Sequence, residues 1–98
     1  MKSVSPPLAE HFIYPGLTEL GARPPAKIII DQPQVSSRHA VLESRPGLDG
    51  RWEIVLTDHG STNGTFVNGK RIKRCKLKDG DRIRLARVEL ELRYLEQE

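Results

Sequence analysis

Glycine, proline and asparagine interrupt this chain so often that no segment carries an apolar stripe at helical spacing. The apolar residues occur instead in short runs, about one every ten residues, with turn-forming residues between them. Residues 28–30 are three isoleucines flanked by prolines, and Trp52, Ile54 and Leu56 are spaced to share one face of a strand. This pattern predicts an all-β domain, either a sandwich or a barrel.

Tight turns are predicted at three places in the second half of the chain. Asn68-Gly69 separates two short strand-like segments, and both residue types tolerate a positive φ, which a type I′ hairpin requires. Gly80 follows an aspartate in a similar context, so we expect a positive φ there as well. The apolar alternation changes phase near residues 86–87, which requires a turn or a bulge at that point.

Length and composition exclude several classes of protein. The 98 residues suffice for one domain with one core. No apolar run approaches the length of a membrane-spanning helix, and the first residues lack the apolar segment of a secretory signal. The single cysteine, Cys75, excludes an internal disulfide framework. We therefore expect a cytoplasmic protein without membrane insertion, with residues 1–10 as a tail or edge segment and residues 11–98 as the domain.

The positive charge is concentrated in residues 70–87, although the whole chain carries only +3. This segment holds nine of the sixteen basic residues against two acidic ones, whereas the rest of the chain is mildly acidic. Such a segment suits an anionic partner, for example a phosphoprotein or a nucleic acid. It is equally compatible with a solvated face that keeps the protein soluble.

Three motifs follow one another along the chain. They read PQVSSRHA at residues 33–40, GSTNGTFVNG at residues 60–69 and LKDGDRI at residues 77–83. Together they resemble the forkhead-associated (FHA) domain family, and the resemblance extends from about residue 20 to residue 92. It implies a two-sheet β-sandwich of about ten or eleven short, mostly antiparallel strands, whose loops at one end bind a protein or peptide that contains phosphothreonine.

The resemblance also implies which residues bind the ligand. Ser36 matches the serine that donates its hydroxyl to the phosphate, and Thr62 and Asn63 match positions that contact the phosphate and the peptide backbone. A phosphate group attracts guanidinium, hydroxyl and backbone N–H donors, which loops supply readily. Ser36 could instead close a local turn, and Asn63 could form a turn with Gly64 as well as bind. The predicted binding residues are Arg23, Ser36, Ser37, Arg38, Thr62 and Asn63.

Other motif positions are expected to shape the loops rather than to touch the ligand. His39 matches a histidine that braces the loops by hydrogen bonds. The remaining positions are glycines and one asparagine that fix turns or close packing. The predicted structural residues are Gly21, His39, Gly64, Asn68, Gly69 and Gly80.

The chain departs from the family pattern at the arginine that clamps the phosphate. The family places this arginine directly after glycine, but here Gly21 is followed by Ala22, and Arg23 comes next. Lys27 also stands where the family usually has aspartate or asparagine. Either Arg23 reaches the phosphate from a shorter loop, or the main phosphate clamp is missing. We expect Arg23 to be the clamp, because its fork can make paired, charged hydrogen bonds.

The sequence favours a binding module over an enzyme. Residues 64–70 resemble a P-loop but lack the serine or threonine after the lysine, and the histidines and Cys75 show no metal-binding spacing. We expect no catalytic residue, cofactor or metal. Two alternatives remain, namely protein binding that does not depend on phosphate and nucleic-acid binding through residues 70–87. No aromatic residue lies within that basic run to stack on nucleic-acid bases, so we expect no nucleic-acid partner. We expect the chain to be a monomeric protein-binding domain.

Overall fold

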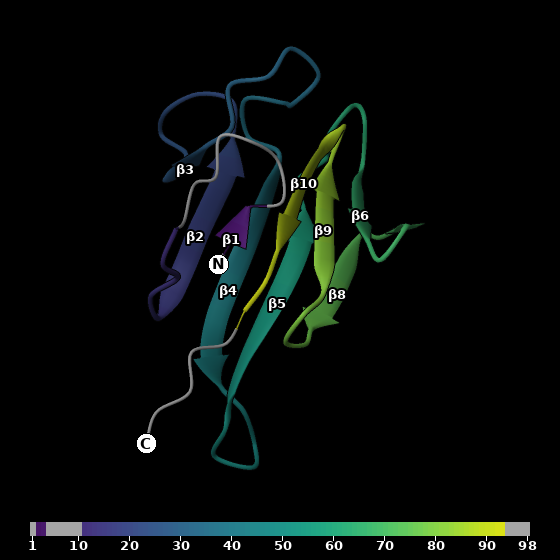
Figure 1. Ribbon diagram of the computed structural model, residues 1–98. Coiled ribbons are helices and arrows are strands. Elements are labelled where there is room, and N and C mark those ends of the chain that lie inside the picture. The colour runs from purple at the N-terminus through teal and green to yellow at the C-terminus, as the bar shows by residue number, and fades with distance from the viewer. Residues whose placement is uncertain (1, 4–10, 94–98) are drawn as a thin grey trace.

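The computed structural model describes residues 2–3 and 11–93, which form two five-stranded sheets packed face to face (Figure 1). One sheet has the order β1-β10-β9-β6-β7 and the other β3-β2-β4-β5-β8. This confirms the all-β, two-sheet sandwich. No helix that could cross a membrane occurs in the described ranges. The strands of these residues are β1 (Lys2–Ser3), β2 (Gly16–Gly21), β3 (Ile28–Ile29), β4 (Ala40–Pro46), β5 (Trp52–Asp58), β6 (Thr65–Val67), β7 (Lys70–Arg71), β8 (Arg74–Leu77), β9 (Arg82–Leu85) and β10 (Val88–Glu91).

All neighbouring strands within the described residues are antiparallel except β2 and β3. In that parallel pair Leu20 lies opposite Ile28. Because the two strands run in the same direction, the chain must turn back after β2 and turn again before β3. The connecting residues 22–27 therefore form a loop at the end of the sheet, and this loop carries Arg23. The prediction that residues 1–10 form a tail or edge segment falls largely outside the described residues and stays a prediction.

The predicted turns are confirmed. Asn68 and Gly69 have φ values of 50° and 86°, as a type I′ hairpin between β6 and β7 requires. Residues 86–87 form the tight turn between β9 and β10, and Ala86 has a φ of 55°. Gly80 has a φ of 88°, so the conformation at this position also matches the expectation.

The core lies between the two sheets and is built from the inward-facing residues of both. Leu20, Leu42 and Leu56 come from one sheet, and Ile83 and Leu85 come from the other; all five are fully buried. Burial of each such side chain stabilises the fold by about 1.5–3 kcal/mol relative to exposure. This packing fixes the ends of the strands, and thus the loops between them.

Trp52 does not join this core, contrary to the alternation of Trp52, Ile54 and Leu56 in the sequence. Its side chain is 51% exposed, whereas Ile54 and Leu56 are buried. The cause is that Trp52 pairs with Pro46 in the hairpin of β4 and β5, which projects beyond the other strands (Figure 1). Among the described residues, no strand of the first sheet, which contains β1, β10, β9, β6 and β7, covers the hairpin there.

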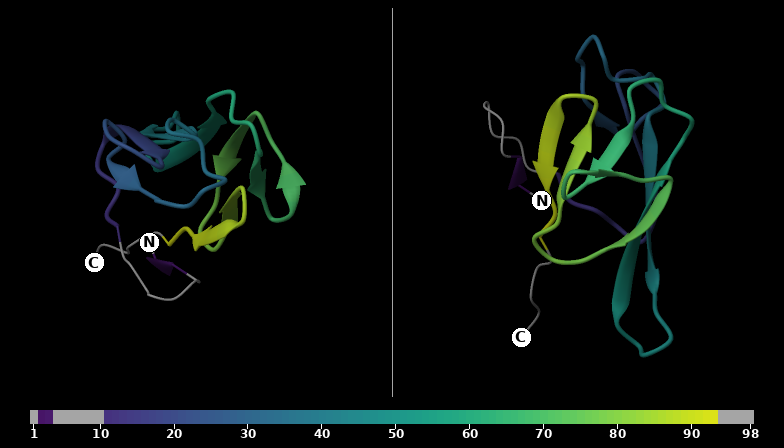
Figure 2. Two further views of the ribbon diagram at one scale, coloured as in Figure 1. Left: turned by 90° about the horizontal axis from the view of Figure 1, so that it is seen from above. Right: turned by 90° about the vertical axis from the view of Figure 1, so that its right-hand side faces the viewer.

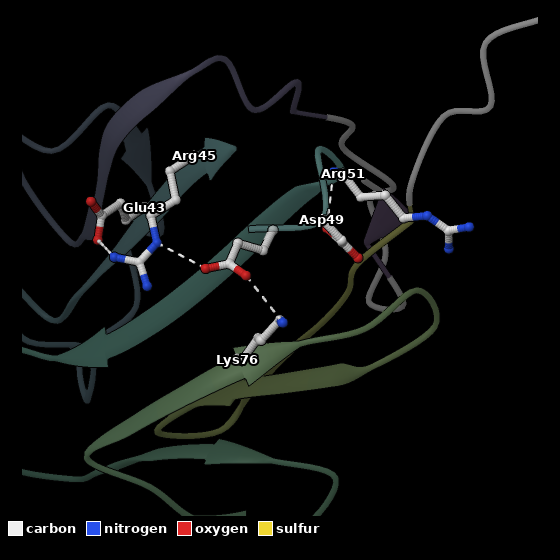
Figure 3. A network of polar contacts seen from close by, with 6 residues as sticks. Glu43, Arg45, Asp49, Arg51 and Lys76 are labelled. Atoms are coloured by element: carbon white, nitrogen blue, oxygen red, sulfur yellow. Dashed lines mark hydrogen bonds and ion pairs between the residues drawn. The ribbon is translucent and has the colours of Figure 1, made fainter. Parts of the chain in front are cut away.

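Charged side chains form a ladder across the outer face of the second sheet (Figure 3). Arg45 pairs with Glu43 at 3.3 Å and with Glu53 at 3.0 Å, and Lys76 pairs with Glu53 at 3.1 Å. The hydrogen bond from Lys76, followed by the one from Arg45, holds the pKa of Glu53 below its usual range. Because such pairs are solvated, the ladder contributes little to stability. It does, however, give Arg45 and Lys76 acidic partners.

Candidate functional site

Three loops meet at one end of the sandwich, opposite the hairpin of β4 and β5 (Figures 1 and 2). They follow β2, β3 and β5, and each connects to a strand of the packed core. A cavity of about 440 Å³ lies between them. Five of the six predicted binding residues line it. The lining residues are Ala22, Arg23, Asp31, Gln32, Pro33, Gln34, Val35, Ser36, Ser37, Thr62 and Asn63.

Arg23 reaches the cavity from a tight turn after β2. The backbone N–H of Ala26 donates to the carbonyl of Arg23 at 3.1 Å, and that of Lys27 donates to the carbonyl of Glu19 at 3.0 Å. These bonds hold the shorter loop against the sheet. The Arg23 side chain is exposed and forms no ion pair with another described residue. Its guanidinium is therefore available to an anion in the cavity, which favours the first of the two interpretations of the loop.

Buried His39 joins the two loops on the other side of the cavity. The backbone N–H of Ser36 donates to His39 Nδ1 at 3.0 Å, and His39 Nε2 lies 2.8 Å from the carbonyl oxygen of Gly64. Because Nδ1 accepts, the proton is assigned to Nε2, which donates to Gly64. The imidazole thus has both nitrogens engaged with the backbone. It fixes the separation of Ser36 from the loop that carries Thr62.

The hydroxyl of Ser36 is held in place but keeps its proton for a ligand. The backbone N–H of Thr62 donates to Ser36 Oγ at 3.3 Å, which leaves the O–H free to donate. Asn63 spans the same gap, since its Nδ2 donates to the carbonyl of Gln34 at 2.8 Å. The Oδ1 of Asn63 and its second N–H are left for other partners. A bracing role and a binding role are therefore compatible in both residues.

Asp58 organises the loop between β5 and β6, and the sequence analysis missed it. Its carboxylate accepts backbone N–H bonds from Gly60 and Ser61 at 3.0 and 3.1 Å, and hydroxyl bonds from Ser61 and Thr65 at 2.5 and 2.6 Å. Burial raises the pKa of Asp58, but these hydrogen bonds outweigh burial and hold the pKa below its usual range. An aspartate two residues before a glycine at a strand end is the signal that could have revealed it.

Arg38 is the predicted binding residue that does not line the cavity. Its guanidinium pairs with the carboxylate of Glu19 at 2.8 Å on the surface. Ser37, its neighbour in the chain, does line the cavity. The assignment of Arg38 to binding thus remains a prediction without a geometric argument in its favour.

The arrangement suits a tetrahedral anion and does not suit nucleophilic catalysis. The cavity lining includes one arginine, three residues with hydroxyl groups and one asparagine, namely Arg23, Ser36, Ser37, Thr62 and Asn63. Charged and neutral donors of this kind bind phosphate oxygens. The neighbouring imidazole is not placed to act as a base toward the Ser36 hydroxyl, because its unprotonated nitrogen, Nδ1, accepts the backbone N–H of that same residue. Among residues 2–3 and 11–93, no group of three potential metal ligands is found.

Comparison with known proteins connects this geometry to one family. The FHA domain family model matches residues 18–86. The chain is 32% identical over 90 residues to an ABC transporter ATP-binding/permease protein of Mycobacterium tuberculosis, covering 92% of the chain and 10% of that protein. It is 33% identical over 73 residues to the glycogen accumulation regulator GarA of Mycolicibacterium smegmatis, covering 74% of the chain and 43% of that protein. The chain therefore spans less than half of either relative.

The solved structures agree with the sequence comparison. A structure from a structural and functional analysis of phosphothreonine-dependent FHA domain interactions superposes with a TM-score of 0.79 at 29% identity. The match covers 96% of this chain and 91% of that one. Mycobacterium tuberculosis EmbR in complex with a low-affinity phosphopeptide is also similar, with a TM-score of 0.68 at 30% identity over 80% of this chain and 20% of that one. The MEK1 FHA domain in complex with a phosphothreonine peptide of HOP1 matches with a TM-score of 0.65 at 26% identity over 76% of each chain.

Proposed function

The chain belongs to the FHA domain family, and from this premise we propose that it is a non-catalytic module that binds phosphothreonine peptides in the cavity at the loop end of the sandwich. One observation carries the proposal: Arg23, Ser36 and Thr62, which come from three separate loops, line one cavity. In this proposal the chain acts within a signalling or regulatory protein, reads the product of a Ser/Thr kinase, and has no catalytic activity of its own. A monomeric state and a cytoplasmic location remain predictions.

The chemistry of phosphate explains why this set of donors would discriminate phosphothreonine from threonine. A phosphate ester carries about −1.5 to −2 charges at neutral pH and three strong acceptor oxygens. Arg23 would supply the opposite charge, and the hydroxyls of Ser36 and Thr62 would complete the shell of donors. An unmodified threonine has neither the charge nor the acceptors, so these donors would gain nothing from it beyond what water provides.

The direct test is calorimetric titration of the domain with a phosphothreonine peptide library and with the same library unphosphorylated. We expect measurable affinity for the first and none for the second at the same salt concentration. Equal affinity for the two libraries would contradict the proposal and would favour an interaction module that ignores phosphate.

Arg23→Ala is expected to weaken phosphopeptide binding by about 10- to 100-fold, because one charged, forked contact is lost. Arg51→Ala is the matched control, since this exposed arginine lies near the hairpin of β4 and β5 at the opposite end (Figure 3). Both variants should unfold like the parent. If the Arg23→Ala variant binds phosphopeptide as tightly as the Arg51→Ala variant, Arg23 is not the phosphate clamp.

Ser36→Ala is expected to lower affinity about tenfold while leaving the fold intact, since the loss is one hydroxyl donor to a charged oxygen. The backbone N–H of Ser36, which bonds to His39, is retained in this variant. Asn63→Ala should also lower affinity, and it should slightly lower the folding stability because the hydrogen bond to the Gln34 carbonyl is lost. Fluorescence anisotropy with a labelled phosphopeptide measures both. Unchanged affinity in both variants would mean that the ligand does not enter this cavity.

A further inference from the structure

Two arginines and a phenylalanine form a row on the outer face of the first sheet. Phe66 lies opposite Arg71 on one neighbouring strand and opposite Arg84 on the other. Directly opposed residues of antiparallel strands point to the same face, and that face is the outer one, because the adjacent Thr65 and Val67 are buried. The guanidinium of Arg84 stacks 3.9 Å from the centre of the Phe66 ring. We call Arg71, Phe66 and Arg84 the arginine strip.

The strip begins at the rim of the candidate cavity. A Cβ atom at Gly64 would lie 3.0 Å from Arg71 Nε and 2.9 Å from an edge atom of the Phe66 ring. Gly64 directly follows Asn63, which lines the cavity. The Ala86 N–H also donates to the carbonyl of Gly64 at 3.2 Å, so the turn between β9 and β10 adjoins the same loop. A peptide that leaves the cavity over this loop would reach the strip at once.

The bases of the strip are not neutralised by ion pairs. On the outer face of the opposite sheet, Arg45 and Lys76 have acidic partners (Figure 3). Neither arginine of the strip forms an ion pair with another described residue. Glu89 lies opposite Arg84 on β10, but the two side chains form no ion pair. The Arg84 guanidinium instead contacts Phe66 and donates to the carbonyl of Ala86 at 2.8 Å.

We propose, building on the proposed function, that the phosphothreonine peptide is acidic on one side of its phosphorylated residue and that these carboxylates lie along the arginine strip. The cavity itself holds one arginine and one aspartate, Arg23 and Asp31, so it attracts no further acidic residue. The strip adds two positive charges just outside it. Stacking on Phe66 orders the Arg84 guanidinium in advance, which reduces the entropy lost when a carboxylate binds.

Two features favour a peptide over a nucleic acid. The basic residues of the 70–87 segment are divided between the two sheets, since β8 belongs to one while β7 and β9 belong to the other. They therefore do not form one stripe that could follow a phosphate backbone. The single aromatic ring of the strip is covered by Arg84, so it offers no open face for a base.

The test uses three phosphothreonine peptides of equal length, with neutral flanks, with aspartates only before the phosphothreonine, and with aspartates only after it. At low salt we expect one acidic peptide to bind about fivefold more tightly than the neutral one, which corresponds to one or two exposed charge pairs. Arg71→Gln should remove part of this gain, and the double variant Arg71→Gln/Arg84→Gln should remove all of it. Affinity for the neutral peptide should change less than twofold. Arg51→Gln, at the opposite end of the molecule, should keep the whole gain.

Two results would overturn the inference while leaving the proposed function in place: no gain on either side, or a gain that survives Arg71→Gln and the double variant. If loss of the Arg84 contacts prevents folding, Arg71→Gln alone keeps the test decisive, because the Arg71 side chain has no hydrogen bond or ion pair with another described residue. Failure of every phosphopeptide to bind would contradict both the proposed function and the role of the arginine strip. Binding of a short DNA duplex that competes with the acidic peptide and is lost in the double variant would assign the strip to nucleic acid.

Discussion

Gly21→Ala is expected to lower the free energy of unfolding by about 3 kcal/mol, and to abolish phosphopeptide binding in the molecules that still fold. A Cβ atom at Gly21 would lie 1.9 Å from the carbonyl oxygen of Ser37 and 2.7 Å from its carbonyl carbon. These are backbone atoms, so no side-chain rotation relieves the overlap. The loop that carries Ser36 must move away from β2, or the domain must unfold.

Movement of that loop has consequences for both stability and binding. The Ala22 N–H donates to the carbonyl of Ser36 at 3.0 Å, and the His39 N–H donates to the carbonyl of Leu20 at 2.9 Å. Both bonds lie beside Gly21 and stretch when the loop is displaced. Ser36 then leaves its position opposite Thr62, and the cavity loses its arrangement of donors. The close approach of the Ser36 loop to β2 therefore requires a residue without a Cβ atom at position 21.

Urea denaturation followed by far-ultraviolet circular dichroism measures the effect. Gly50→Ala is the control, because a Cβ atom there meets no other atom within 4 Å and the φ of 80° imposes only backbone strain. We expect the control to lose about 1–2 kcal/mol and to bind phosphopeptide normally. A Gly21→Ala variant as stable as the control, or one that binds like the parent, would show that the loop adjusts without cost.

The strands and turns were predictable because local sequence determines them. Asn68-Gly69 adopts the two positive φ values that its residue types allow, and a change of alternation predicts the turn at residues 86–87. Trp52 shows the limit of such reasoning. Alternation gives the face of a strand on which a residue lies, but whether that face is covered depends on how far the opposite sheet extends.

The site was predictable only in part, because some of its contacts join residues that only the folded chain brings together. Motif residues such as Ser36 and Thr62 were found through a family resemblance, and they do line one cavity. Asp58 was missed because its role arises from four donors that the folded loop brings to one carboxylate. The pairing of Arg38 with Glu19 across nineteen positions likewise has no local signature.

Hydrogen bonds within the protein brace the loops around the cavity. His39 links the two loops, Asn63 bonds to Gln34, and Asp58 closes the loop between β5 and β6. A ligand that enters such a cavity orders few additional groups, so little of its interaction energy is lost to entropy. Substitution of these bracing residues should therefore weaken binding even where they touch no ligand, because the loops of the unbound protein would be less ordered and would lose more entropy on binding.

Asp58→Ala is expected to cost about 3 kcal/mol of folding free energy at pH 7, because it removes the acceptor of four hydrogen bonds and leaves their donors unpaired. The difference from the parent should depend on pH. The folded state lowers the pKa of Asp58, so its ionised form stabilises the protein above the unfolded pKa, which is near 3.8. This contribution is lost as the pH falls through the lower, folded value. The gap between parent and variant should therefore be constant from pH 7 to pH 5 and shrink below pH 4.

Urea titrations of both proteins at pH 7, 5, 4 and 3 measure this gap directly. Taking the difference between the two proteins cancels the titration of other carboxylates, including Glu53, whose pKa is also lowered. Asp58→Asn is the second variant, because the amide keeps the shape and one acceptor but carries no charge. We expect it to lose less stability than Asp58→Ala and to show no acid-dependent change of its own at this position. A gap between the parent and Asp58→Ala that stays unchanged from pH 7 to pH 3 would mean that the charge on Asp58 does not hold the loop, and that uncharged contacts of the side chain account for the loss.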